Sequence, residues 1–288
     1  MRKMHPFHRT ELLVGGEGFD RLSGASAIVI GLGGVGSYAA EALVRSGVGR
    51  VVLVDFDKVC VTNVNRQLHA TRKTVGKSKA ELMGERCEAI NPKCEVVVMP
   101  VFYERSTSDA ILGEGADYVL DCIDNMKAKL DLLETCVQRG LPVISAMGAG
   151  GRMDPTRIRV SDLSETRIDP FARIVRENLR ERGIESGFEC VWTDEPPNDL
   201  DAAAQAAFKC ICAEKDNGKH TCDMRLQVQG SVAWMPAMFG LTMAGTVVHR
   251  LLDRPLASDA RPKPRMKAMS GKLSNQRKRE LLAELAER

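Results

Sequence analysis

The stretch AIVIGLGGVGSYAAEALVRSGVGRVVLVD, residues 27–55, decides the fold. It opens with a short apolar run that ends in glycines and continues with residues of helical composition up to Gly47. A second apolar run, rich in β-branched residues, closes it. Two such runs around one helix predict a β-α-β unit. The alternation recurs more loosely up to residue 148 and predicts an α/β, Rossmann-like, doubly wound and mainly parallel sheet with helices on both faces.

The other elements are expected from the same patterns. We predict helices at 77–90, 108–112 and 127–139, and strands at 94–101, 117–124 and 142–148. Beyond Gly151 the regular alternation of strands and helices ends. RIRVSDL, residues 157–163, fits an edge strand, and we expect additional antiparallel strands toward the C-terminus. A charged helix at 169–182, a polar excursion at 195–218, a short strand and a buried helix beginning near Pro236 complete the prediction.

Composition favours a globular protein of the cytoplasm. Of 288 residues, 44% are hydrophobic and 27% charged, and the net charge of +3 is too small to prove a nucleic-acid partner. The N-terminal MRKMHPFHRT has no apolar stretch of the kind a secretory signal needs, and the nine scattered cysteines fit reduced core residues. Residues 226–248 carry no formal charge, but polar interruptions at Gln227, Gln229 and Ser231 argue against a membrane span.

Gly31, Gly33 and Gly36 stand in G-x-G-x-x-G spacing between a predicted strand and a predicted helix. Amides at the start of such a helix can receive a phosphate. Asp55 follows Gly36 by 19 residues, where a carboxylate can hydrogen-bond a ribose hydroxyl. These features predict nucleotide binding but leave the nucleotide open, and NAD is allowed at this point.

The residues after Asp55 favour a triphosphate. The segment up to residue 79 contains Asp55, Asp57, Asn63, Asn65, Arg66, Lys77 and Lys79. Activation of a carboxylate by ATP sends an oxygen to the α-phosphorus and expels pyrophosphate, so positive charge must gather around the phosphates. The planar guanidinium of Arg66 can bind two phosphate oxygens at once, and the Lys79 ammonium can supply a mobile point charge. Taken alone, the stretch also fits an ordinary solvated basic face.

The motifs GLGGVGS, LVDFDKV, TNVNRQ, VGKSKAE, INP and DCIDN resemble, in order and spacing, the ubiquitin-activating-enzyme-like adenylating superfamily. The resemblance covers roughly Arg9 to Arg250. It implies ATP and Mg²⁺ as cofactors. For the nucleotide, it implies that Gly34 contacts ATP, Asp55 holds the ribose, and Asp57 and Asn125 join the nucleotide site. For the phosphates and the metal, it implies that Asn63 and Arg66 contact the phosphates, Lys79 supports the departing pyrophosphate, and Asp124 binds magnesium. A capping carboxylate is the structural alternative for Asp124.

The resemblance also implies a homodimer. Arg9, in FHRTELLVGGEGFDRL, matches an N-terminal arginine that the superfamily extends into the partner subunit's ATP site. Arg66, Lys79, Asp124 and Arg9 are therefore the expected catalytic residues. From the sequence alone, Arg9 is equally compatible with a surface cation.

One branch of the superfamily fits best. Residues 148–180, GAGGRMDPTRIRVSDLSETRIDPFARIVRENLR, resemble the tRNA threonylcarbamoyladenosine dehydratase family. This resemblance implies adenylation of the threonyl carboxylate of the modified adenosine on tRNA, followed by ring closure through the carbamoyl nitrogen. We expect an adenylating domain at 1–255, with substrate-specific crossover loops at 165–225, and a basic tail at 256–288.

Two basic regions are candidates for tRNA contact. The predicted helix carries Arg173, Arg176, Arg180 and Arg182, whose spacing would align part of their charge on one face. Residues 260–288 carry nine Lys or Arg and three Glu. A solvated surface helix, balanced by Glu177 and Glu181, and a solvated tail are the alternatives.

The alternative function is adenylation of a ubiquitin-like sulfur carrier in thiamine or molybdopterin synthesis, and a sulfur-transfer partner protein stays open. Several such enzymes hold zinc with two Cys-x-x-Cys pairs, and this chain has none. Cys210, Cys212, His220 and Cys222 could form a tetrahedral site, but their tight spacing favours free thiols. Cys190 is expected to be structural, because Glu189, Asp194 and Glu195 would raise its pKa. An NAD-dependent dehydrogenase and a non-catalytic scaffold fit less well.

Overall fold

The computed structural model describes residues 4–207 and 229–259. The chain divides into two compact units, Met1–Pro255 and Leu256–Arg288. The first contains the sheet and its helices. Of the second, only residues 256–259 are described, with the short helix η5 at Ala257–Asp259. The basic stretch 260–288 and the Cys210, Cys212, His220 and Cys222 group lie outside the described residues.

A seven-stranded sheet forms the centre of the first unit, with strand order β3-β2-β1-β4-β5-β7-β6. The strands are β1 Ser26–Ile30, β2 Arg50–Val54, β3 Glu95–Met99, β4 Tyr118–Asp121, β5 Val143–Ala146, β6 Ile158–Asp162 and β7 Glu189–Thr193. All neighbours are parallel except the β6–β7 pair. The mainly parallel α/β sheet and the edge strand at RIRVSDL are confirmed. The antiparallel part consists of β6 alone, because β7 runs parallel to β5.

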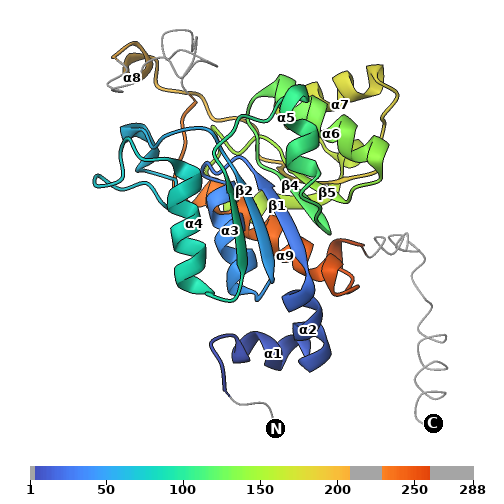
Figure 1. Cartoon of the computed structure of the whole chain (residues 1–288). Helices are drawn as coiled ribbons and strands as arrows, with labels where there is room; N and C mark the ends of the chain where they lie inside the picture. The colour runs from blue at the N-terminus through green and yellow to red at the C-terminus, as the bar shows by residue number, and fades with distance from the viewer. Residues whose placement is uncertain (1–3, 208–228, 260–288) are drawn as a thin grey trace, which may run out of the picture. The chain divides into compact units, whose positions relative to one another are not determined.

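Helices cover both faces of the sheet (Figure 1). One face carries α3 Gly36–Arg45, α4 Lys79–Ile90 and α9 Trp234–Leu251, and the other carries α5 Arg105–Leu112, α6 Met126–Arg139 and α7 Pro170–Glu181. In β1, Ala27 and Val29 join the core under α3 and α9, while Ile28 and Ile30 join the core under α6 and α7. Burial on both faces explains why this strand is apolar at successive positions.

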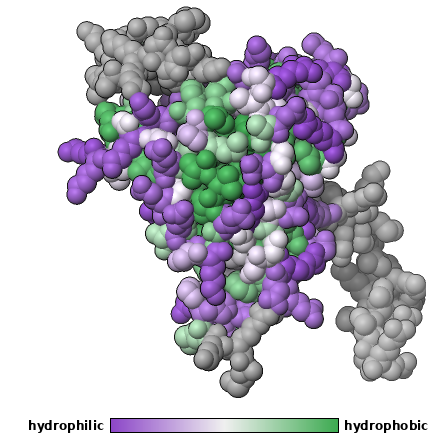
Figure 2. All heavy atoms as spheres, in the orientation of Figure 1, coloured by the Kyte–Doolittle hydropathy of each residue, from purple (hydrophilic) through white to green (hydrophobic). Residues whose placement is uncertain are grey.

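Shorter elements flank this core. Helices α1 His8–Val14 and α2 Gly16–Gly24 precede β1, and α8 Ala202–Ala207 follows β7. The single-turn helices are η1 Val61–Asn63, η2 Pro155–Arg157 and η3 Leu163–Glu165. Figure 2 shows hydrophobic residues gathered between α4 and α5 on the face that Figure 1 presents. The strand at that edge is β3, whose last four residues are only half-buried.

Several predicted boundaries shift by a few residues. Helix α4 begins at Lys79 rather than at residue 77, because the Ser78 hydroxyl caps it by accepting from Glu81 N. Helix α9 begins at Trp234, two residues before Pro236. The short strand expected ahead of it is absent from residues 229–233, and residues 226–228 lie outside the described part. None of the described helices is both long enough and apolar enough to cross a membrane.

Candidate active site

The glycine loop, residues 31–36, joins the carboxyl end of β1 to α3. Gly31 has φ +89°, and a Cβ there would lie 2.8 Å from the Cys122 carbonyl oxygen. A Cβ at Gly36 would lie only 1.8 Å from the Gly31 oxygen, so neither position tolerates a side chain. No side chain of the described residues caps α3, which leaves amides of its first turn for a bound anion.

The glycine loop lies where the strand order reverses. Strand β1 pairs with β2 on one side and with β4 on the other, and β4 follows later in the chain. In open α/β sheets, ligands bind at such a reversal, outside the carboxyl ends of the strands. The loop after β1, the segment after β2 and the segment after β4 therefore frame one candidate site.

Asp55 connects the glycine loop to the end of β2. Its Oδ2 accepts from Leu32 N at 2.6 Å, and its Oδ1 accepts from Asp57 N at 2.8 Å. Burial raises the pKa of Asp55, while the charge of Lys79 and the two backbone donors oppose that shift. The structure thus places this carboxylate at the glycine loop. Its contact with a ribose stays a prediction.

Lys79 opens α4 and is only 6% exposed. Its Nζ donates to Asp57 Oδ2 at 2.8 Å. Burial alone would lower the pKa of Lys79, but the charges of Asp55, Asp57 and Asp124 outweigh it and raise that pKa. A buried ammonium whose charged form is favoured by Asp55, Asp57 and Asp124 therefore lies at this edge of the sheet.

Asn63, Asn65 and Arg66 lie at η1 and the turn after it. Asn63 is buried, and its Oδ1 accepts from Cys60 N at 2.9 Å. Half-buried Arg66 donates through Nη1 to Thr62 O at 2.8 Å and to Asn65 Oδ1 at 3.0 Å. A Cβ at Gly34 would lie 3.3 Å from Arg66 O, so this turn packs against the glycine loop. The phosphate contacts of Asn63 and Arg66 stay a prediction.

Asp124 and Asn125 follow β4 at the same edge of the sheet. Asn125 caps α6 by accepting from Ala128 N at 3.1 Å, so the capping role that we considered for Asp124 belongs to its neighbour. Asp124 is exposed, and its charge acts on Lys79. An exposed carboxylate beside a predicted phosphate site suits Mg²⁺, which is commonly held by one or two carboxylates together with substrate phosphates.

The predicted basic residues outside this site are arranged in different ways. Arg9 is exposed on α1. On α7, Arg173 and Arg180 are exposed, whereas Arg176 turns back and donates to Thr166 O at 3.0 Å. Arg182, at the end of α7, pairs with Glu134 of α6 at 2.7 Å. Part of the predicted basic face is therefore engaged within the fold.

Cys190 is fully buried in β7. Burial is the main reason that its pKa lies well above the usual range, and Asp162, Asp121 and Asp169 add to the shift. Our prediction named Glu189, Asp194 and Glu195 as the cause, and that reason is wrong. Glu189 points instead to Arg250, 2.6 Å away.

Sequence reasoning gave no role to Gln67, His69 and Arg152, all of which are buried. Gln67 lies next to the glycine loop: its Nε2 is 3.8 Å from where a Gly33 Cβ would stand. Its Oε1, both ring nitrogens of His69 and the Nε of Arg152 have no hydrogen-bond partner among the described residues. Gln67 ends the motif TNVNRQ, so its position in a motif was the available signal.

A glycine loop and a lysine held by carboxylates, at one edge of a Rossmann-like sheet, define a nucleotide-binding α/β protein. The chain belongs to the ThiF family, whose model matches residues 7–286. It is 43% identical over 249 residues to the tRNA threonylcarbamoyladenosine dehydratase of Bacillus subtilis, covering 86% of this chain and 95% of that relative. The family resemblance drawn from the motifs is thereby confirmed.

Two further comparisons bear on function. The crystal structure of the Escherichia coli tRNA N6-threonylcarbamoyladenosine dehydratase in complex with ATP has a TM-score of 0.73 and 34% identity, and covers 86% of this chain and 94% of that chain. The Escherichia coli sulfur carrier protein ThiS adenylyltransferase is 34% identical over 141 residues, 48% of this chain and 55% of that relative. Similarity to the carrier-protein enzyme thus spans about half of the chain.

Proposed function

We propose that this chain adenylates the threonyl carboxylate of threonylcarbamoyladenosine in tRNA with ATP, and that the activated group then closes to a ring. The protein is an ATP-dependent adenylating enzyme of tRNA modification. The observation that carries the proposal is the buried Lys79 ammonium among Asp55, Asp57 and Asp124, beside a glycine loop that leaves amides for an anion. The full-length similarity to a tRNA threonylcarbamoyladenosine dehydratase supports the choice of substrate.

The reaction has two steps. A threonyl carboxylate oxygen attacks the α-phosphorus of ATP, an O–P bond forms, and the bond to pyrophosphate breaks. The carbamoyl nitrogen then attacks the acyl carbon and loses its proton, and AMP leaves with the former carboxylate oxygen. Water is formally lost from the threonylcarbamoyl group, and the energy comes from ATP cleavage.

The site residues are assigned to the parts of ATP that they would bind or stabilise during the reaction. Amides at the start of α3 receive phosphate oxygens, and Asp55 holds the ribose. Arg66 binds phosphate oxygens with its fork, while Lys79 stabilises the pyrophosphate as it departs. Lys79 must then loosen from Asp57, whose Oδ2 it contacts at 2.8 Å. The amides of α3 are held by the backbone, so they need little reorganisation in the transition state.

Asp124 is the proposed magnesium ligand, and Asn125 holds its segment at the start of α6. Bound Mg²⁺ would neutralise charge that develops on the phosphates.

Arg9 would complete the ATP site of a partner subunit in a homodimer. As an enzyme that acts on tRNA, the protein would work in the cytoplasm. The exposed arginines of α7 and the basic tail are the proposed contacts to tRNA phosphates.

Adenylation of a sulfur carrier's terminal glycine remains the alternative, because the carrier-protein enzyme is 34% identical to this chain over 141 residues. Exchange of labelled pyrophosphate into ATP separates the two functions. We expect exchange with threonylcarbamoylated tRNA and none with a ubiquitin-like sulfur carrier. Exchange with the carrier alone would support the alternative, and exchange with neither would contradict both.

A further inference from the structure

Arg152 is a buried arginine whose hydrogen-bonding capacity is largely unused. It lies in the loop after β5 and is 4% exposed. Its Nη1 donates to Gly150 O at 3.2 Å, but its Nε is buried without a partner among the described residues. An unsatisfied buried donor on a charged group is costly, and a bound anion is one of the few arrangements that would offset this cost.

The charges of Asp169 and Glu195 act on Arg152, but both carboxylates accept hydrogen bonds from other groups. Asp169 accepts from the backbone amides of Gly148, Phe171 and Ala172. Glu195 accepts from Met153 N and Asp154 N, and from Asn198 Nδ2 at 2.8 Å. Within residues 4–207 and 229–259, no carboxylate oxygen forms an ion pair with Arg152. The fold thus keeps both neighbouring anions on other donors and leaves the guanidinium for an anion from outside.

The Arg152 loop is connected to the glycine loop through residues 229–236. Gly151 N donates to Gly230 O at 2.8 Å, and Asn65 Nδ2 donates to Ser231 O at 3.0 Å. At the other end of the segment, Pro236 Cβ lies 3.0 Å from where a Gly34 Cβ would stand. Because β5 is parallel to β4, the Arg152 loop also emerges at the carboxyl edge of the sheet. Arg152 therefore belongs to the same edge as the proposed ATP site.

Trp234 supplies an exposed aromatic surface beside Met153, the residue that follows Arg152. It is 46% exposed and is the first residue of helix α9. Its indole Nε1 donates to Met153 O at 2.8 Å, which holds the ring next to the residue that follows Arg152. A fixed and accessible indole is a surface on which an unstacked RNA base can lie.

We propose that Arg152 and Trp234 form the subsite for the modified nucleoside: the guanidinium binds the threonyl carboxylate and the indole stacks on the adenine. This inference rests on the proposed function and names how its substrate is held. The bidentate geometry of a guanidinium suits a carboxylate, and binding there would satisfy the unpartnered Nε. The carboxylate would then lie at the sheet edge from which it attacks ATP.

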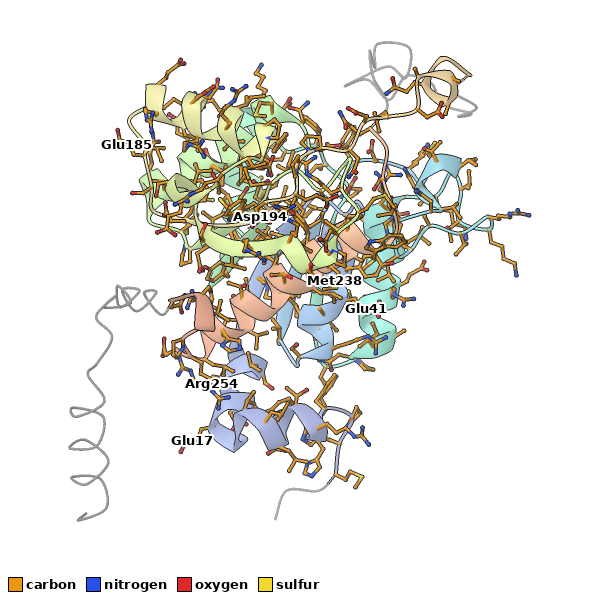
Figure 3. All side chains as sticks on the ribbon, turned by 180° about the vertical axis from the view of Figure 1, so that it is seen from behind. Glu17, Glu41, Glu185, Asp194, Met238 and Arg254 are labelled. Carbon is orange, nitrogen blue, oxygen red and sulfur yellow. The ribbon has the colours of Figure 1, made fainter. Side chains whose placement is uncertain are left out.

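The test compares Arg152→Gln and Arg152→Lys with Arg159→Gln. Arg159 lies in β6, has a side chain that is 47% exposed, and pairs with Asp194, which Figure 3 labels. The substrates are an anticodon stem-loop RNA carrying the threonylcarbamoyl group and the same RNA with unmodified adenosine. AMP formation gives kcat and KM, RNA titration gives the affinity for each RNA, and calorimetry gives the affinity for ATP.

We expect Arg152→Gln to lower kcat/KM on the order of 100-fold and to abolish the preference for modified over unmodified RNA, with ATP affinity unchanged. Arg152→Lys keeps the positive charge but lacks the planar guanidinium, and its kcat/KM should fall about tenfold. Trp234→Ala should raise KM about tenfold, whereas Trp234→Phe should not. Met238→Ala, the matched truncation one turn further along α9, should behave as wild type (Figure 3).

Contrary results separate the two proposals. If the wild-type protein binds ATP but forms no AMP with the modified RNA, the proposed function fails and the subsite with it. If the wild type turns over and Arg152→Gln keeps its kcat/KM and RNA preference, only the subsite is wrong. Should Arg152→Gln lose ATP binding through misfolding, Arg152→Lys decides, and full kcat/KM in that variant contradicts the subsite.

Discussion

Several side chains at the carboxyl edge of the sheet could be predicted as site residues from the sequence. Asp55, Asp57, Lys79 and Asp124 were predicted as site residues, and the structure brings them together. The ends of neighbouring parallel strands meet at one edge, so position along the chain is enough to place such residues. The Lys79–Asp57 contact was not predictable, because it depends on the path of the chain between residues 57 and 79.

Arg66 gives the cleanest test of phosphate stabilisation. Its side chain contacts Thr62 and Asn65 at the surface, whereas loss of Lys79 would leave the buried Asp55 carboxylate without its cation. We expect Arg66→Gln to lower kcat on the order of 100-fold while RNA affinity and melting temperature hardly change, because the fork acts on transition-state charge. Steady-state AMP formation measures this, and an equal loss of RNA affinity would show that Arg66 binds RNA instead.

His69 should make stability depend on pH. Burial, together with the charges of Lys79 and Arg86, lowers its pKa from 6.5 to about 4. As pH falls, His69 therefore takes up a proton in the unfolded state before it does so in the folded state. The contribution of neutral His69 to the free energy of unfolding is fully present above about pH 6.5 and is lost as pH falls toward 4. Relative to His69→Leu, which removes the titration, the wild type should lose on the order of 3 kcal/mol over that range.

Urea denaturation of both proteins between pH 7 and pH 4 measures the difference. The comparison cancels the titration of the carboxylates that both proteins share. Leucine is a suitable replacement because both ring nitrogens of His69 are buried without partners among the described residues. Parallel stability curves for the two proteins would mean that His69 is not the titrating group.

Secondary-structure elements were predicted well where the pattern was local. The first β-α-β unit, the strands up to residue 146 and the edge strand β6 follow from apolar runs and glycines in the sequence. No strand was predicted at Glu189–Thr193, and the direction of this strand, β7, depends on which strand it pairs with rather than on its own residues. The role of residues 229–236 depends on contacts with residues 65 and 151, which no local pattern indicates.

Gly36 tests the fit between β1 and α3. In Gly36→Ala, the new methyl group would lie 1.8 Å from Gly31 O, so α3 and the glycine loop must separate. We expect ATP affinity to fall at least tenfold and the melting temperature to drop. Gly245→Ala is the matched control, since that helical glycine of α9 has open space and should become slightly more stable. Normal ATP affinity in Gly36→Ala, measured by calorimetry, would contradict the assigned phosphate site.

Assembly of the protein determines whether Arg9 can act. In the proposed homodimer, Arg9 of one subunit serves the ATP site of the other, so Arg9→Ala and Arg66→Gln subunits should complement each other. Mixed dimers would contain one complete site, and an equimolar mixture should recover about a quarter of wild-type AMP formation. Each variant alone should be nearly inactive. No recovery after subunit exchange, verified by native mass spectrometry, would mean that Arg9 serves its own subunit or none.

The central claim is that a carboxylate of the substrate becomes joined to AMP at the edge of this sheet. Modified RNA labelled with ¹⁸O in the threonyl carboxylate tests it most directly, because ring closure must transfer one carboxylate oxygen to the departing nucleotide. Mass spectrometry should find AMP heavier by one ¹⁸O. Unlabelled AMP, or ADP and phosphate in place of AMP, would contradict the account.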